Sequence, residues 1–248
     1  VEWLSEKDIQ RLFHFSSPGG ILSHAAAQTD PYGFTQDLLQ FLVRHRAEVY
    51  DGTEIKDISY QKEKIKLTTD LGYTISADRL IIACGYESVH YLPKKVGIIK
   101  STYAIISEPA AAGNFWYKDA LIWETADPYL YLRATKDNRI IVGGKDDDFS
   151  DPSKREAVQK EKSKALLNAF HKLLPSIPFK TDFTWSGAFS SSKDGLPYIG
   201  SVPERKNTFF ALGFGGNGII FSVVAAQIIT DLLKDKKNPD AEIFGFNR

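Results

Sequence analysis

Apolar residues recur at the three-to-four-residue spacing of a helix in four stretches of the chain. Ser5 stands as an N-cap before the short stretch EKDIQRLF, and Asp30 and Pro31 open a second helix in which Phe34, Leu38, Leu39 and Leu42 share one face. Asp151 and Pro152 open a long third helix that Pro175 ends, with apolar positions from Val158 to Leu173. The fourth stretch runs from Gly218 to about Leu233 and is apolar on all sides, which predicts a buried helix.

Strand patterns fill the segments between these helices. GILSHAAAQ and AEVYDG are predicted to be extended, and EIKDISYQ, KIKLTTD and LGYTISA alternate as the strands of hairpins do. RLIIACG is apolar without alternation, which is typical of a strand buried on both faces in a parallel sheet. Further strands are predicted at GIIKSTYAIIS, ALIWET, YLYLRAT, RIIVGG, DFTWSGAF and NTFFALG. We therefore expect an α/β or α+β protein, with a mixed, largely antiparallel sheet beside a parallel one.

Composition narrows the classes of function. The 31 basic and 31 acidic residues cancel, so no overall field favours nucleic acid or an anionic membrane, and neither partner is expected. The run Asp146-Asp147-Asp148 has the character of a solvated loop. The apolar part of the helix after Gly218 is too short for a membrane span, which needs roughly 20 residues. A single cysteine, Cys84, excludes an internal disulfide and any multi-cysteine zinc site, and it agrees with a reducing, cytoplasmic compartment.

Common catalytic motifs do not occur in the sequence. No G-x-S-x-G is present, which argues against an α/β-hydrolase. The five histidines are scattered and no H-E-x-x-H occurs, so no metal site is expected.

One glycine motif carries more information. Gly213 to Gly218 satisfies G-x-G-x-x-G between a predicted strand and a predicted helix. An NAD fingerprint would need a second strand ending in an acidic residue, and only about 30 residues follow. What remains is a backbone that a ligand can approach closely and a helix N-terminus whose N–H groups face something anionic or electron-rich. The alternative is a tightly packed corner without a ligand.

The C-terminal third carries a set of motifs in a fixed order. Trp185-Ser-Gly187 comes first, then Asp194-Gly-Leu-Pro-Tyr-Ile-Gly200, then Gly213 with Asn217-Gly-Ile219 before the apolar helix. In this order and spacing the chain resembles the D-amino-acid-oxidase-like flavoprotein family, which includes glycine oxidase and sarcosine oxidase. The order Asp30-Pro31, hairpin and LIIACG, and the strand Arg139 to Gly144, extend the resemblance to most of the chain.

The resemblance implies a domain arrangement. Residues 21–90 and 186–248 would belong to an FAD-binding, Rossmann-like subdomain, and 91–185 with 1–20 to a substrate-binding subdomain. In this family the ADP-binding G-x-G-x-x-G segment lies at the N-terminus, and nothing before Ile21 resembles it. Because the chain has no methionine, even at position 1, we expect it to start downstream of the translation start and to lack that segment.

The resemblance also implies a non-covalent FAD site. Glu54 and Ile55 would lie near the adenine or ribose, and Ala83, Cys84 and Gly85 near the phosphates and ribitol. The flavin ring would lie at Gly216, Asn217, Gly218, Ile219 and Ile220, where a helix N-terminus stabilises negative charge on the reduced ring. For Cys84 the alternative is a small buried residue at a strand end.

On the substrate side the chain departs from its relatives. Amino-acid-oxidising members often read W-x-G-x-R-P, in which the arginine binds the substrate carboxylate, and here Phe189 stands in the arginine's place. Tyr129, Tyr131 and Arg133 are the substrate-side candidates, although Arg133 could equally face solvent. The expected reaction is hydride transfer from a small amine or amino acid to flavin N5, giving an imine that hydrolyses. The alternatives are a flavoenzyme for a 2-hydroxy acid or polyol, and a non-catalytic binding fragment.

Overall fold

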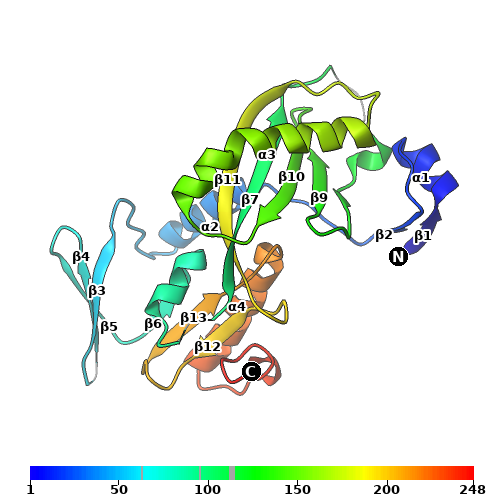
Figure 1. The fold of residues 1–248 in the computed structure, drawn as a ribbon. Coiled ribbons are helices and arrows are strands. Elements are labelled where there is room, and N and C mark those ends of the chain that lie inside the picture. Colours follow the sequence, from blue (N-terminus) through cyan, green and yellow to red (C-terminus); the bar gives the residue numbers. More distant parts are fainter. Residues whose placement is uncertain (63, 95, 112–114) are drawn as a thin grey trace. The chain divides into compact units, whose positions relative to one another are not determined.

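The computed structural model describes residues 1–62, 64–94, 96–111 and 115–248, and the chain divides into two compact units (Figure 1). The first unit comprises residues 1–28 and 100–188, and the second comprises residues 29–99 and 189–248. Each unit therefore contains segments that are far apart in the sequence. Among the described residues, no helix is both long enough and apolar enough to cross a bilayer.

The first unit is built on a five-stranded sheet. Its strand order is β11 (Thr181–Ser191), β7 (Ile98–Ser107), β10 (Ile140–Asp147), β9 (Leu130–Ala134) and β8 (Ile122–Trp123). The pairs from β7 to β8 are antiparallel, as the alternation of the middle segment predicts. Residues on β9 alternate strictly, because Leu130, Leu132 and Ala134 are buried while the residues between them are half-buried.

Helix α3 (Pro152–Leu173) covers one face of this sheet (Figure 1). The Asp151 side chain caps it by accepting from the backbone N–H groups of Ser153 and Lys154. Leu166 and Phe170 of α3 are fully buried in one core with Leu132 and Val142 of the sheet. At about 1.5–3 kcal/mol per fully buried side chain, this apolar layer is the main contribution to the stability of the unit.

The N-terminal segment closes the same core. β1 (Glu2–Ser5) pairs antiparallel with β2 (Gly19–Leu22), and α1 (Glu6–Phe13) lies between them in sequence. Ser5 caps α1, as the sequence predicts, and together with Asp8 it forms a capping box. Ile9 and Phe13 are buried with the residues under α3, so α1 contributes directly to this core.

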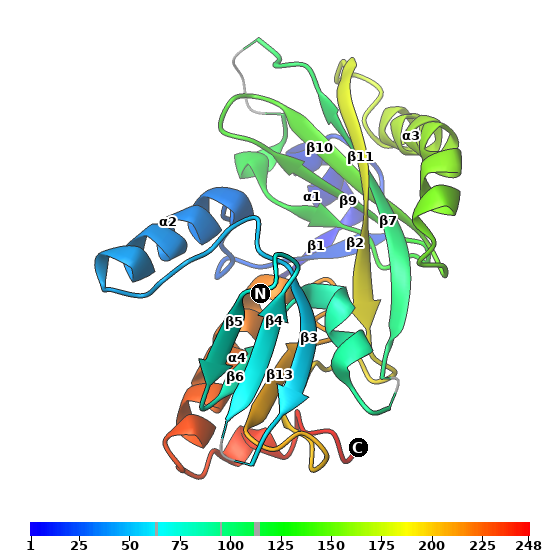
Figure 2. The same ribbon diagram turned by 90° about the vertical axis from the view of Figure 1, so that its left-hand side faces the viewer.

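The second unit contains two three-stranded sheets. In the first, β12 (Tyr198–Ser201) pairs antiparallel with β13 (Thr208–Leu212), which pairs in parallel with β6 (Leu80–Ile82). In the second, β3 (Ile55–Tyr60), β4 (Ile65–Thr69) and β5 (Thr74–Ala77) form an antiparallel meander, visible in Figure 2. The parallel pairing of β6 with β13 confirms that RLIIACG and NTFFALG share a sheet.

The helices of the second unit are α2 (Pro31–Arg44) and α4 (Gly218–Leu233), with short 3-10 segments η1 (Gly85–Tyr91) and η3 (Pro239–Ala241). The first unit has one such segment, η2 (Tyr117–Asp119). Asp30 caps α2 through the Tyr32 N–H. Ala225, Ile228 and Ile229 of α4 pack with Ile199 and Ala211 of the β12–β13 hairpin. The C-terminal half of α4 is thus a core element of the unit.

Several sequence predictions in this unit are wrong. AEVYDG is not a strand, because no neighbouring strand pairs with it, and the turn after α2 is instead closed by a bond from the Ala47 N–H to the Leu42 carbonyl. RLIIACG is not buried on both faces, because β6 is an edge strand and Ile81 is 48% exposed. The N-terminal half of α4 is not buried either, since Ile220 is 66% exposed.

Candidate functional site

Two predicted cofactor segments meet at one sheet edge. β6 and β13 run parallel, so their carboxyl ends lie at the same edge. Ala83, Cys84 and Gly85 follow β6, and the glycine turn 213–217 follows β13. In open α/β sheets, ligands bind at the carboxyl ends of the strands. Segments more than 120 residues apart in the sequence are thereby placed side by side.

The glycine turn leads directly into α4. Gly213 and Gly215 adopt left-handed φ angles of 77° and 55°, which few other residues tolerate, and the Gly215 N–H donates to the Ser190 carbonyl at 2.9 Å. A Cβ built at Gly215, Gly216 or Gly218 would meet no atom within 4 Å, so the turn borders open space. A ligand can therefore approach this backbone closely.

The N-terminus of α4 is not capped by a side chain. Asn217 occupies the N-cap position without a side-chain hydrogen bond, and the first turn contains no acidic residue. The first intrahelical bond runs from the Phe221 N–H to the Asn217 carbonyl, so the N–H groups of Gly218, Ile219 and Ile220 have no partner inside the helix. The helix dipole adds a partial positive charge at the same point.

Cys84 is exposed, which contradicts the expectation of a small buried residue. β6 ends two residues earlier at an edge of the sheet, so no neighbouring strand covers this position. The Cys84 Sγ lies 3.4 Å from the Oγ of buried Ser88 in η1. Gly85 has a φ of 60° and open space around it, which allows the chain to turn into η1.

Ile55 begins β3, in the other sheet of the same unit, and Glu54 directly precedes it. The Glu54 carbonyl accepts from the Asp70 N–H at 2.9 Å, and its carboxylate pairs with Lys56 at 2.7 Å. The pKa of Tyr91 in η1 is raised by burial first, then by negative charge at Cys84, Glu87 and Glu54.

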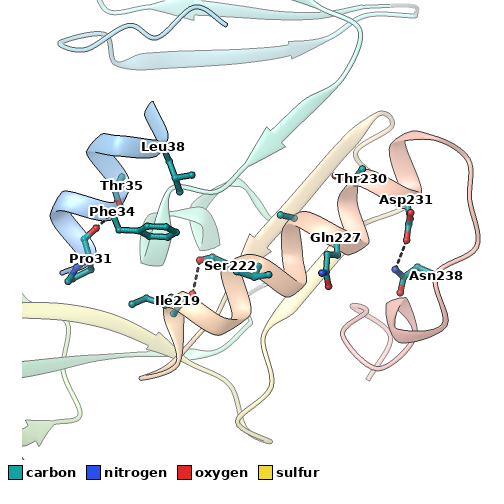
Figure 3. Close-up of a pocket in the computed structure, with 13 residues that line it drawn as sticks. Pro31, Phe34, Thr35, Leu38, Ile219, Ser222, Gln227, Thr230, Asp231 and Asn238 are labelled. Atoms are coloured by element: carbon teal, nitrogen blue, oxygen red, sulfur yellow. Dashed lines mark hydrogen bonds between the residues drawn. The ribbon is translucent and has the colours of Figure 1, made fainter. Parts of the chain in front are cut away.

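A groove of about 920 Å³ runs between α2 and α4 and starts at the N-terminus of α4 (Figure 3). Pro31, Phe34 and Leu38 line one side of it, and Ile219 and Val223 line the other. The hydroxyls of Thr35 and Ser222 bond to carbonyls of their own helices, which leaves the walls largely apolar. Among the described residues no lysine or arginine lines this groove, whereas Asp231 does, so these residues do not suit a pyrophosphate.

The substrate-side candidates lie together on the first unit. Tyr129, Tyr131 and Arg133 alternate with Leu130 and Leu132, which face the α3 core, so the three candidates share the opposite face of the sheet. The Tyr129 and Tyr131 rings are 6.2 Å apart. Gly143 of β10 pairs with Tyr131, and a Cβ at Gly143 would overlap the Tyr131 ring and hydroxyl. The absence of a side chain at Gly143 therefore makes room for this tyrosine.

The expectation of a solvated loop at Asp146-Asp147-Asp148 is wrong for the first two residues, which belong to β10, while Asp148 lies beyond the strand with its side chain 79% exposed. Asp147 belongs to β10, accepts a 2.9 Å bond from the Tyr103 hydroxyl and pairs with Lys162 of α3 at 2.5 Å. Asp146 points to the other face, where burial first and then the negative charge of Asp146 raise the pKa of the Tyr129 hydroxyl. The strand RIIVGG continues past its glycines, and its alternation carries the two neighbouring carboxylates to opposite faces. Sequence reasoning missed Asp146 because the run of three charged residues was assigned to a loop after the strand.

Asp194 of the D-G-x-P motif has a structural role. Its carboxylate accepts from the Arg248 guanidinium, from the Leu196 N–H and from the Ser192 hydroxyl. The same guanidinium donates to the Leu196 and Pro197 carbonyls and lies 4.3 Å from the Tyr198 ring centroid. The motif therefore anchors the C-terminus beside β12, a contact that the sequence did not predict.

The fold is that of known flavoenzymes. Glycine oxidase from Geobacillus kaustophilus superimposes with a TM-score of 0.82 at 20% identity, over 100% of this chain and 66% of that one. Reduced L-alpha-glycerophosphate oxidase from Mycoplasma pneumoniae, which has FAD bound, superimposes with a TM-score of 0.80 at 15% identity, over 96% and 66%.

The sequence then places the chain in a family. The profile of the FAD dependent oxidoreductases (DAO) matches residues 1–232, and the chain belongs to this family. Glycine oxidase of Bacillus subtilis (strain 168) is 26% identical over 247 residues, which cover 96% of this chain and 63% of the relative. The matched region thus spans less than two thirds of the length of this relative.

Proposed function

We propose that this chain provides the flavin-contacting and substrate-contacting parts of an enzyme that oxidises a small amine or amino acid with FAD. The observation that carries the proposal is the meeting of the β6 and β13 carboxyl ends beside the uncapped N-terminus of α4. Membership of the FAD dependent oxidoreductase family supports it. When bound, FAD supplies the acceptor for the hydride that leaves the carbon beside the substrate nitrogen.

The residues at this edge fit the cofactor. Gly216, Asn217, Gly218, Ile219 and Ile220 offer backbone donors, open space and two exposed apolar side chains, which suit the edge and face of a flavin ring. Donors at the start of a helix stabilise negative charge without any reorganisation. Ala83, Cys84 and Gly85 would face the phosphate and ribitol region, and Glu54 and Ile55 the adenosine.

The substrate would bind on the sheet face that carries Tyr129, Tyr131 and Arg133. Orientation of the amine is the main contribution required of the protein, because no nucleophile takes part in hydride transfer. Phe189 cannot bind a carboxylate as an arginine does, so Arg133 is the candidate cation for that group.

The pyrophosphate would be held by polypeptide outside these residues. No described lysine or arginine lines the groove between α2 and α4, whose walls are largely apolar. We propose that a further strand and helix, with the glycine turn that binds ADP in this family, cover the groove and the open edge of β6. The relatives are longer than this chain, which supports that proposal.

Loss of flavin absorbance on anaerobic mixing with substrate tests the reaction class in the FAD-loaded protein. Amines and amino acids are expected to bleach the flavin, and matched 2-hydroxy acids are not. The second candidate function is oxidation of a hydroxy compound. It is favoured by the fold that this chain shares with the glycerophosphate oxidase. Bleaching by hydroxy acids or polyols alone would select that candidate.

A further inference from the structure

Three aromatic rings and one carboxylate gather on the sheet face opposite α3. Trp123 of β8 pairs with Tyr131 of β9, so their side chains stand on the same face. The Trp123 ring lies 6.2 Å from the Tyr129 ring in an edge-to-face arrangement, and Tyr129 lies 6.2 Å from Tyr131. Asp146 of β10 completes the group, because the N–H of the preceding residue, Lys145, donates to the Tyr129 carbonyl at 3.2 Å. Burial first, and then the negative charge of Asp146, raise the pKa of the Tyr129 hydroxyl.

The carboxylate retains an unused acceptor. The Oδ1 atom of Asp146 is buried and has no hydrogen-bond partner among the described residues. A buried carboxylate oxygen without a partner costs about 1–3 kcal/mol, so a cation bound beside it would be favoured. The Lys100 ammonium pairs with Asp148 at 2.8 Å, and this hydrogen bond is the first cause of its raised pKa. The negative charge of Asp146 is a lesser cause of the same shift.

The aromatic rings provide the other half of a cation site. Aromatic faces attract cations, and groups of rings recognise alkylated ammonium ions in particular. Trp123 is 64% exposed, so a small ligand can reach the group from solvent. Gly143 keeps the space in which the Tyr131 ring lies. The group therefore combines an open aromatic wall with a carboxylate at its base.

We infer that Trp123, Tyr129, Tyr131 and Asp146 form a binding site for an alkylated ammonium group. The inference rests on the proposed function in so far as this ammonium belongs to the substrate, and it narrows the substrate class to N-alkylated amines. Arg133 follows Tyr131 on the same face, about 7 Å further along the strand. A zwitterion can thus place its ammonium at Asp146 and its carboxylate toward Arg133.

Binding of choline to the full 248-residue chain tests the site without any flavin. Calorimetry would give the affinity, and the Trp123 indole N–H resonance, assigned with Trp123→Phe, would give the location. The matched neutral probe is 3,3-dimethylbutan-1-ol, which has the same shape without the charge. Choline is expected to shift this resonance and to bind about tenfold more tightly than the alcohol.

Variants distinguish binding at this site from non-specific attraction of choline to negative surface charge. Asp146→Asn keeps the shape of the side chain and is expected to weaken choline binding about tenfold. Glu161→Gln removes an exposed carboxylate on α3, which covers the other face of the sheet, and is expected to change binding less than about twofold. If Asp146→Asn alters the circular dichroism spectrum, Trp123→Leu at an exposed position takes its place, with the same expected loss.

The inference is overturned by equal binding of choline and the alcohol, or by unchanged choline binding in both Asp146→Asn and Trp123→Leu. It is also overturned if the Trp123 indole resonance does not shift up to about 50 mM choline. These outcomes are independent of the flavin reaction. An enzyme that bleaches with amines but does not bind choline here would retain the proposed function and lose this site. Choline binding without bleaching by amines would retain this site and contradict the proposed function.

Discussion

A single missing side chain positions Tyr131. Because a Cβ at Gly143 would overlap the Tyr131 ring, Gly143→Ala is expected to displace the ring and to destabilise the unit by about 1–3 kcal/mol. Gly187→Ala on β11 is the matched control, since its Cβ would come no closer than 3.9 Å, to the Thr102 methyl. Thermal denaturation of the two variants is the measurement. Equal melting temperatures would show that Tyr131 moves aside freely.

Phe189 makes a second prediction about individual side chains. If its presence reflects substrate choice, the FAD-loaded protein should oxidise N-substituted amines in preference to free glycine or D-alanine. Phe189→Arg should shift the ratio of kcat/KM toward the free amino acids, because the guanidinium pairs with their carboxylate. Fast turnover of free glycine by the unaltered protein would contradict this prediction, unless Arg133→Ala abolished that turnover.

The contact between Asp194 and the C-terminal Arg248 ties together two segments of the second unit. The hydrogen bond from Arg248, then those from Leu196 and Ser192, lower the pKa of Asp194 from 3.8 to about 2. A carboxyl group whose pKa is lower in the folded state stabilises the protein above its unfolded pKa. That stabilisation is lost as the pH falls from about 4 toward 2.

Asp194→Asn should therefore lower the melting temperature near pH 6, and the difference from the unaltered protein should shrink toward pH 2. The measurement is the melting temperature of both proteins across that range. Asp240→Asn is a suitable control, because the Asp240 residue is exposed and its described hydrogen bonds use the backbone N–H and carbonyl. A difference that stays constant with pH would show that the carboxylate charge is not responsible.

Most elements could be predicted from local signals, and burial could not. Capping residues at Ser5, Asp30 and Asp151 marked three helix starts correctly, because a cap acts within its own turn. Whether an apolar face is covered depends on what packs against it. Ile81 and Ile220 are apolar and exposed for that reason. The short strand β12 was missed because its register comes from β13 rather than from its own sequence.

The candidate site was predicted unevenly. The glycine turn and the α4 N-terminus follow from residue types, and their position at the carboxyl ends of β6 and β13 agrees with the family order. Cys84 is exposed because β6 lies at a sheet edge. Asp146 lies on the face opposite α3 because β10 continues past its glycines. A sequence pattern contains neither fact. The assignment of each residue to cofactor or substrate stays a prediction.

For the molecule as a whole, the open groove predicts weak cofactor binding. The exposed apolar faces of α2 and α4 and the open β6 edge leave the pyrophosphate without charge-assisted donors in the described residues. Spectroscopic titration of the 248-residue chain with FAD should therefore give little or no complex. A longer form that includes the proposed strand and helix with the ADP-binding glycine turn is expected to bind tightly. A stoichiometric complex of the shorter chain at about micromolar FAD would show that another element holds the cofactor.

Cys84 gives the experimenter a chemical handle. It is the one cysteine in the sequence, its side chain is exposed, and it follows β6 at the edge where the glycine turn also lies. A maleimide dye would therefore attach at one defined position without any substitution. Its emission would change when a strand or a nucleotide covers that edge. The unmodified sequence thus contains its own reporter for the assembly of the cofactor site.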